Sequence, residues 1–448
     1  MDRGHEAGGH PVSCRRLETE TLGVAGVVRA LDRSPDAVAP EIHRSVEAIL
    51  EAVRERGDAA LLEFTERFDG VKLGAAELTV TAEEIAAARA LVGDEVVRAL
   101  SYAAERIETF HRHALPRSWW VEDQNGSVLG QQVRALDRVG VYVPGGRAAY
   151  PSTVLMTAIP AKVAGVREIV LVSPPRGDKS VHPAVLVAAE IAGVTEVYRV
   201  GGAQAVGALA FGTGTIRRVD KIVGPGNIYV ALAKLRVAGF ARIDTVAGPS
   251  EVVVVADDGA PPEWVAADLL AQAEHDPMAR AVLLTPSPDL IDGVLGQVER
   301  QLAALPRQEI AREALRANGA LVLTRDVAEA VAVANGLAPE HLELLVEDPF
   351  RWLPLVENAG AIFLGRYAPE VVGDYVAGPS HVLPTQGTAR VASGLGVEDF
   401  VKRSSLIQYS PRGLREAWPH LSALARAEGL EAHGEAARLR LGQEGALP

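Results

Sequence analysis

Cysteine, aromatic residues and long apolar runs are scarce in this 448-residue sequence, and each shortage excludes a class of protein. The single cysteine, Cys14, excludes an intramolecular disulfide and any Cys-x-x-Cys motif, which fits a reducing compartment. No window contains the roughly 18 continuous apolar residues that a membrane span requires, and residues 1–20 lack the apolar stretch of a signal peptide. The sequence therefore predicts a soluble, cytoplasmic protein with no membrane partner.

Positive charge is also in short supply. The chain has 45 Lys and Arg against 58 Asp and Glu, a net charge of −13, and no local basic patch. Such a chain repels phosphate backbones, so we expect no nucleic-acid partner. Hydrophobic residues make up 48% of the chain and aromatic residues only 5%, which predicts a folded protein with a mainly aliphatic core.

The first third of the chain has the pattern of helices. Apolar residues recur at helical spacing in residues 42–53, before Gly57 and Asp58 interrupt the stripe. Thr81 and Glu84 have the spacing of a capping box, which predicts the start of a helix that continues to about Phe110.

From Arg138 onward, short aliphatic runs such as VGVYV, EIVLV and EVYRV alternate with helical segments, and the same rhythm resumes after DTVAGPSEVVVVAD. Parallel strands joined by helices produce this alternation. We therefore predict an α/β protein with two Rossmann-like parallel-sheet domains, N-terminal helices and a small helical C-terminal tail that docks elsewhere, such as on a neighbouring subunit. The expected division is an N-terminal extension and arm at 1–39, a larger domain at 40–141 plus 248–395, a smaller Rossmann-like domain at 142–247 and a helical segment at 396–448. In this division the N-terminal helices pack on the second of the two α/β halves, at 248–395.

Three glycine-rich turns follow predicted strands, at residues 143–153, 200–212 and 223–230. None contains G-x-G-x-x-G. Glycine lets a backbone approach a ligand closely, and a helix N-terminus attracts an anionic group. Any one of these turns is explained by tight folding alone, but three in one half favour a nucleotide site.

Two pairs of polar residues lie at the ends of predicted elements. One pair ends a helical segment, and the other precedes a strand. Gln272 and His275 lie one helical turn apart and share a face, so they can ligate one metal; a histidine placed there by the helix dipole is the alternative. Glu340 and His341 directly precede the strand LELLV. A carboxylate beside an imidazole suits acid–base catalysis, although an exposed loop pair is the commoner explanation.

Two further pairs lie near the C-terminus. Asp374 and His381 belong to the loop GDYVAGPSHVLPT, which offers a carboxylate and an imidazole within a few residues. Glu428 and His433 lie in AEGLEAH, where solvated charges are the default expectation. Together the pairs favour an enzyme, but their spacing does not name a reaction.

The order of the motifs GVYVPGG, VGGAQAVGALAFGT, GPGNIYV, AGPSEVVVVAD, DLLAQAEHDP, APEHLEL, GDYVAGPSHVLPT, GLGVEDFVKR and AEGLEAH resembles the histidinol dehydrogenase family over residues 40–440. The resemblance implies the oxidation of L-histidinol to L-histidine with two NAD through an enzyme-held histidinal, as the last step of histidine biosynthesis. It also implies a homodimer with shared active sites.

The resemblance further implies a role for each motif residue. His341 would be the general base, and Glu340 would activate water. One zinc per subunit would be bound by Gln272, His275 and Asp374 of one chain and His433 of the other. The expected substrate contacts are Ser250, Gln272, His275, His341, Asp374, His381, Glu428 and His433, and the expected NAD contacts are Tyr142, Gln204 and Asn227.

Two other functions stay open at this point. A paralogue could oxidise another alcohol, such as a sulfonated diol, while it keeps the metal and the catalytic pair. A catalytically silent zinc- or nucleotide-binding protein could retain the fold. The intact Glu340–His341 pair argues against the silent protein, and the absence of an arginine cluster argues against an anionic diol.

Overall fold

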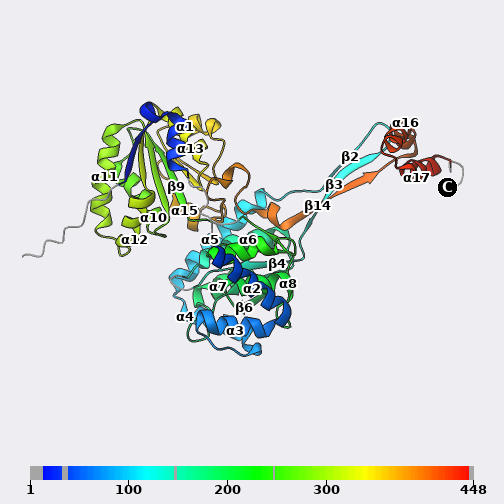
Figure 1. Cartoon of the computed structure of the whole chain (residues 1–448), viewed down its shortest axis with the longest axis horizontal. Coiled ribbons are helices and arrows are strands. Elements are labelled where there is room, and N and C mark those ends of the chain that lie inside the picture. Colours follow the sequence, from blue (N-terminus) through cyan, green and yellow to red (C-terminus); the bar gives the residue numbers. More distant parts are fainter. Residues whose placement is uncertain (1–13, 33–38, 146–148, 246–247, 443–448) are drawn as a thin grey trace, which may run out of the picture.

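Two parallel β-sheets, each covered by helices on both faces, and a projecting antiparallel sheet make up the chain (Figure 1). The structure is a computed structural model that describes residues 14–32, 39–145, 149–245 and 248–442. Within these residues, no helix has both the length and the apolar character needed to cross a bilayer. The mixed α/β class expected from the sequence is confirmed.

The first sheet has the order β6-β5-β4-β7-β8, and all its strands are parallel. Its strands are β4 (Arg138–Tyr142), β5 (Glu168–Ser173), β6 (Glu196–Arg199), β7 (Lys221–Val223) and β8 (Arg242–Ile243). The helices that follow them are α6 (Pro151–Ala164), α7 (Pro183–Ala192), α8 (Gly202–Phe211) and α9 (Ile228–Val237). The chain leaves β4 in opposite directions along the sheet, which is the strand order of a Rossmann-like domain.

The N-terminal helices pack on this first sheet. These are α2 (Pro40–Arg56), α3 (Asp58–Asp69), α4 (Ala82–Leu91) and α5 (Asp94–His113). Val46 and Leu61 share a core with α8 and α9, whereas Val97 and Ile107 share one with α6 and α7. The expectation that these helices cover the second half is therefore wrong. The physical reason is that α7 and α8 are apolar on nearly every side and need an outer layer of helices.

The capping box at Thr81 is confirmed, because the Thr81 hydroxyl accepts from the Glu84 N–H and the Glu84 carboxylate accepts from the Thr81 N–H. The single helix expected from Thr81 to Phe110 is instead two helices. α4 ends at Leu91, and Gly93 is the N-cap of α5.

The second sheet has the order β1-β11-β10-β9-β12-β13 and is also parallel throughout. Its strands are β1 (Arg15–Glu18), β9 (Glu251–Ala256), β10 (Arg280–Thr285), β11 (Ala320–Leu323), β12 (His341–Leu345) and β13 (Ala361–Leu364). One face is covered by α10 (Pro262–Ala273), α11 (Pro288–Leu302) and α12 (Gln308–Asn318), and the other by α1 (Thr19–Leu31) and α13 (Val327–Leu337). Two short helices, α14 (Pro349–Trp352) and α15 (Glu370–Tyr375), flank β13 in the chain.

The N-terminal segment contributes to this second body, because β1 pairs with β11 and α1 packs beside α13. Residues 1–13 and 33–38 of the predicted extension lie outside the described part of the chain.

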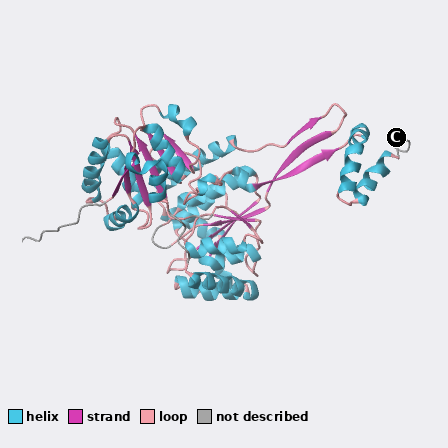
Figure 2. Ribbon diagram, turned by 45° about the horizontal axis from the view of Figure 1, so that its top comes forward, coloured by secondary structure: helices cyan, strands magenta, loops and turns pink. Residues whose placement is uncertain are grey.

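A three-stranded antiparallel sheet, ordered β14-β3-β2, projects from the two bodies and carries the last two helices at its far end (Figures 1 and 2). We call this unit the arm. It consists of β2 (Trp119–Glu122), β3 (Val128–Ala135), β14 (Val401–Gln408), α16 (Pro411–Ala427) and α17 (Glu431–Leu441). The prediction of an entirely helical C-terminal segment is wrong at β14, which pairs with β3 along its whole length.

Candidate active site

The predicted acid–base pair lies at the amino edge of the second sheet. His341 is the first residue of β12, and its backbone pairs with Val252 of the neighbouring strand β9. α10 leads from β9 back to the start of β10, so its C-terminal end, with Gln272 and His275, returns to this same edge. Ala338, in the left-handed conformation with a φ of 48°, ends α13 and turns the chain toward Glu340.

Both members of the pair are buried and held by β9. Glu340 is 5% exposed, and its Oε2 accepts from the backbone N–H of Glu251 at 3.0 Å. His341 is 4% exposed, and its Nδ1 lies 3.1 Å from the Glu251 carbonyl oxygen. A carbonyl oxygen only accepts, so Nδ1 carries the proton and the neutral ring has its lone pair on Nε2. The imidazole is thus set up to take a proton at Nε2.

Burial lowers the pKa of His341 and raises the pKa of Glu340. Removal from water lowers the pKa of His341 to about 4, so the ring is neutral near pH 7, the form that accepts a proton. Burial, with the nearby Glu251 and Asp374 charges, raises the pKa of Glu340 well above its usual value. A raised pKa makes the Glu340 carboxylate a stronger base toward water.

The predicted metal ligands Gln272 and His275 lie side by side, with 3.5 Å between Gln272 Nε2 and His275 Nδ1. Gln272 is fully buried, and its Oε1 has no hydrogen-bond partner among the described residues. An orphaned buried amide oxygen next to an imidazole suits a cation that needs oxygen and nitrogen ligands.

Asp374 and His381 reach the same place from the segment after β13. The Asp374 carbonyl accepts from His381 Nδ1 at 3.0 Å, and His381 Nε2 lies 3.2 Å from the Thr153 hydroxyl of α6. His341, Asp374 and a third residue, Glu370, each offer a ligand atom within 4.8 Å of the others. The Asp374 charge also acts on His341, Glu340 and His381. Ser250, directly before β9, hydrogen-bonds the Glu340 side chain.

Two predicted site residues lie elsewhere. Glu428 and His433 are exposed on the arm, in the turn between α16 and α17 and in α17 itself. Figure 1 shows these helices at the far end of the arm, away from α15 and β9. Within one chain, the structure does not bring them to Gln272, His275 and Asp374.

The predicted NAD residues gather at the carboxyl edge of the first sheet. The Tyr142 hydroxyl, at the end of β4, accepts from the Gly202 N–H at 3.1 Å, and burial raises its pKa to about 12. Gln204 of α8 is 1% exposed, with no partner for its Oε1 among the described residues. Asn227 is exposed and caps α9 through bonds from Tyr229 and Val230. Nucleotides bind at this edge in Rossmann-like sheets.

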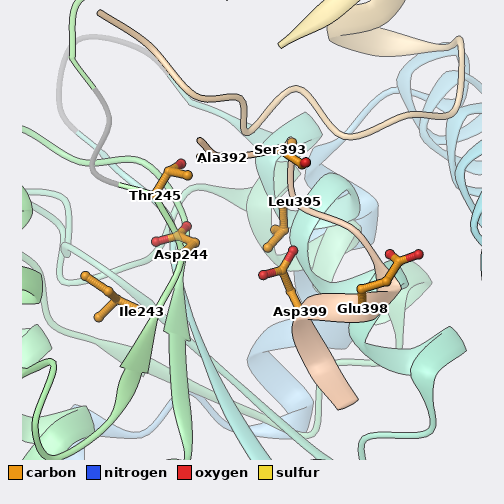
Figure 3. Close-up of a pocket in the computed structure, with 9 residues that line it drawn as sticks. Ile243, Asp244, Thr245, Ala392, Ser393, Leu395, Glu398 and Asp399 are labelled. Atoms are coloured by element: carbon orange, nitrogen blue, oxygen red, sulfur yellow. The ribbon is translucent and has the colours of Figure 1, made fainter. Parts of the chain in front are cut away.

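Buried polar residues hold the glycine turn that follows β7 in place. Gly224 has a φ of 113°, and a side chain there would collide with the Tyr142 carbonyl oxygen. The Gly224 N–H donates to Asp244 Oδ2 at 2.7 Å, and Asp244 forms a buried ion pair with Lys234. Figure 3 shows Asp244 on the wall of a cavity of about 640 Å³ between the end of β8 and residues 392–399. The turn is thus a supported structure and not a loose loop.

Sequence reasoning missed the half-buried Asp268 and four buried charged residues around the pair: Glu251, Arg280, Glu343 and Glu370. Glu251 and Glu343 lie inside the aliphatic runs EVVVV and LELLV, and a charge within a buried strand is the signal that could have found them. Burial and neighbouring carboxylates raise the pKa of Glu343 and of Glu370 well above the usual value.

One buried histidine gives a prediction about stability. His111 of α5 is 1% exposed, lines a mostly apolar cavity of about 630 Å³ with His341 and His381, and has no partner for either ring nitrogen among the described residues. Burial lowers its pKa to about 4.

The unfolded chain therefore binds a proton between pH 6.5 and 4 that the folded chain does not, so stability falls as the pH falls through this range. Relative to His111→Met, we expect the wild type to lose about 2 kcal/mol more between pH 7 and pH 5. Urea unfolding of both proteins at both pH values measures this difference, and equal losses would refute it.

A Rossmann-like sheet with glycine turns at its carboxyl edge, beside a second sheet with a buried acid–base pair, defines a two-domain α/β enzyme. The family model for histidinol dehydrogenase matches residues 32–441. The chain is 55% identical to histidinol dehydrogenase of Syntrophotalea carbinolica over 401 residues, which is 89% of this chain and 93% of that protein. It is 54% identical to that of Geobacillus kaustophilus, over 92% of this chain and 97% of the relative. The crystal structure of histidinol dehydrogenase from Elizabethkingia anophelis superposes with a TM-score of 0.93 at 37% identity, over 98% of this chain and 100% of that one. The chain belongs to the histidinol dehydrogenase family, and it is an oxidoreductase.

Proposed function

We propose that the protein is a zinc-dependent L-histidinol dehydrogenase that oxidises L-histidinol to L-histidine with two NAD, as the last step of histidine biosynthesis. The observation that carries this proposal is the convergence of four separate motifs on the amino edge of the second sheet, in a chain of this family. The single cysteine, Cys14, fits a reducing compartment, so we place the enzyme in the cytoplasm.

Zinc would be held by Gln272, His275 and Asp374. The orphaned Gln272 Oε1, an imidazole and a carboxylate form a nitrogen and oxygen donor set with room for further ligands. When bound, zinc supplies a Lewis acid that orients the substrate's imidazole and amino groups, and NAD accepts the hydrides.

The acid–base work falls to Glu340 and His341. His341 Nε2 takes the hydroxyl proton as hydride leaves the carbinol carbon, which yields the aldehyde. Glu340 takes a proton from water as that water adds to the aldehyde carbon. The proton that His341 took from the alcohol passes to the aldehyde oxygen as the hydrate forms, so the ring is neutral again. His341 then accepts a proton from the hydrate while the second hydride leaves, which yields the carboxylic acid of histidine. This acid, Glu340 and His341 finally lose their protons to solvent. Ser250 and His381 lie where they can contact the substrate.

We assign NAD to the carboxyl edge of the first sheet, with Tyr142, Gln204 and Asn227 as its contacts. The buried Gln204 Oε1 without a partner and the supported turn at Gly224 favour this assignment. Close backbone approach at the turn replaces the usual glycine fingerprint.

The arm supports a homodimer with shared sites. Its exposed apolar side chains include Trp120 at 66%, Ile407 at 72% and Leu424 at 64% exposure, which is costly for a monomer. A second copy of the chain would cover this surface and would bring Glu428 and His433 of each arm to the other chain's site, where His433 would complete the zinc ligands.

The assay that tests the function is the amount of NADH formed per L-histidinol by the zinc-loaded protein, with a sulfonated diol in parallel. We expect two NADH per histidinol, because the alcohol and the aldehyde are each oxidised once. Turnover of the diol alone would identify a paralogue. Zinc and NAD binding without turnover of either compound would identify a silent binding protein.

A further inference from the structure

Glu251 contacts both members of the catalytic pair with three different groups. Its backbone N–H donates to Glu340 Oε2 at 3.0 Å, and its carbonyl accepts from His341 Nδ1 at 3.1 Å. Its side-chain Oε1 accepts from the Glu340 backbone N–H at 3.3 Å. One residue at the start of β9 therefore orients the Glu340 carboxylate, sets the tautomer of His341 and fixes the backbone that carries them.

Arg280 holds Glu251 from the opposite side. The two residues are register partners on neighbouring strands, and Arg280 Nη2 lies 2.5 Å from Glu251 Oε2. Arg280 Nη1 also donates to the Leu31 carbonyl at the end of α1, at 2.9 Å. Glu251 is 2% exposed and Arg280 is 3% exposed, so the ion pair brings together two charges that are both removed from water.

We propose that Glu251 and Arg280 are positioning residues, which act through Glu340 and His341 to hold the water-activating carboxylate and the base in their working geometry. The proposal rests on the function given above and deepens it. A displacement of about 1 Å in a reacting group can lower a rate 10²-fold, so this frame should affect turnover far more than substrate binding.

The Glu251–Arg280 ion pair also affects the balance of charge around Glu340. Glu340 is faced by Glu251 from β9, by Asp374 and Glu370 from α15, and by the adjacent His341. Arg280 neutralises Glu251 and leaves the site without a further uncompensated negative charge. Loss of either partner alone removes this ion pair and leaves the other charge buried beside the catalytic pair.

Three variants test the proposal: Glu251→Gln, Arg280→Gln and the double variant. Glu251→Gln keeps an oxygen for the Glu340 N–H but leaves Arg280 unpaired. We expect its kcat for supplied histidinal to fall about 10- to 100-fold, with the KM for histidinal and for NAD within about twofold of wild type and zinc retained. The double variant can pair amide with amide and carries no net charge, so its kcat should recover at least about tenfold relative to either single variant.

Arg138→Gln is the matched control. Arg138 is 6% exposed and paired with Glu168 and Glu196 at the start of the first sheet, far from Glu340. The Arg138→Gln substitution should lower the unfolding temperature and leave kcat unchanged. A kcat loss in Arg138→Gln of the same size, a parallel rise in KM in Glu251→Gln, or no recovery in the double variant would overturn the proposal.

A measurement on the wild type needs no variant and no substrate. The ¹⁵N NMR spectrum of the zinc-loaded protein, with His341 assigned by comparison with His341→Asn, should show a protonated Nδ1 and an unprotonated Nε2. The reverse tautomer would overturn the role of the Glu251 carbonyl. If the wild type does not oxidise histidinol, the proposed function fails, whereas this spectrum still decides how Glu251 holds His341.

Discussion

Replacement of His341 by asparagine is expected to lower the kcat for L-histidinol by a factor of about 10² to 10⁴, the usual contribution of a general base. The asparagine amide can still donate to the Glu251 carbonyl, where Nδ1 of His341 now donates, so the local fold should persist. It offers no lone-pair nitrogen at the place of Nε2. Steady-state kinetics, with zinc content and NAD affinity measured in the same preparation, test this expectation.

Glu340→Gln separates the two oxidation steps. The amide cannot take a proton from water, so histidinal should form but its hydration and oxidation should be slow. An aldehyde-trapping amine should then capture histidinal, with one NADH formed per histidinol. If His341→Asn retains full turnover, or if Glu340→Gln still yields two NADH per histidinol at the wild-type rate, the assigned roles are wrong.

Mixing two inactive variants is expected to restore activity if the sites are shared between chains. His341→Asn damages the body of the site, whereas His433→Ala damages only the arm, where His433 is exposed in the single chain. After unfolding and refolding together in equal amounts, half of the dimers are hybrids, and each hybrid has one intact site. We expect about one quarter of wild-type turnover, and zinc at about half of the sites, because His341→Asn leaves the zinc ligands intact.

Refolding each variant alone is the control, and it should give no recovery of turnover. Deletion of the residues after Arg426 should abolish zinc binding and turnover together, since it removes Glu428 and His433. Full turnover of the truncated chain as a monomer would show that the site lies within one chain.

The two parallel sheets could be predicted from the sequence because strands buried on both faces are continuous aliphatic runs. β4 and β5 have this form, and the runs VGVYV and EIVLV were expected as strands close to the observed bounds. The arm strands could not be found in this way. β14 is exposed at most of its positions and reads VKRSSLIQ, without the alternation of a half-buried strand.

The site was predictable only in part. Helical spacing joined Gln272 to His275, and adjacency joined Glu340 to His341, but no local pattern brings either pair to Asp374, which lies far along the chain. The resemblance to a family provided that connection. Neither approach pointed to Arg280, because its role depends on strand register with Glu251, and register comes from the assembled sheet.

The order of synthesis has a consequence for the arm. β3 pairs residue by residue with β14, from Ala135 opposite Val401 to Val128 opposite Gln408, so its partner is translated hundreds of residues later. At about 5–20 residues per second, β2 and β3 wait on the order of 15 to 50 s while the edge of β3 that will pair with β14 is open. Both bodies have their strands in place before then, since β13 precedes β14 in the chain. The arm is therefore the last part of the chain to fold, and the nascent protein is most exposed to aggregation and to chaperone capture at the unpaired edge of β3.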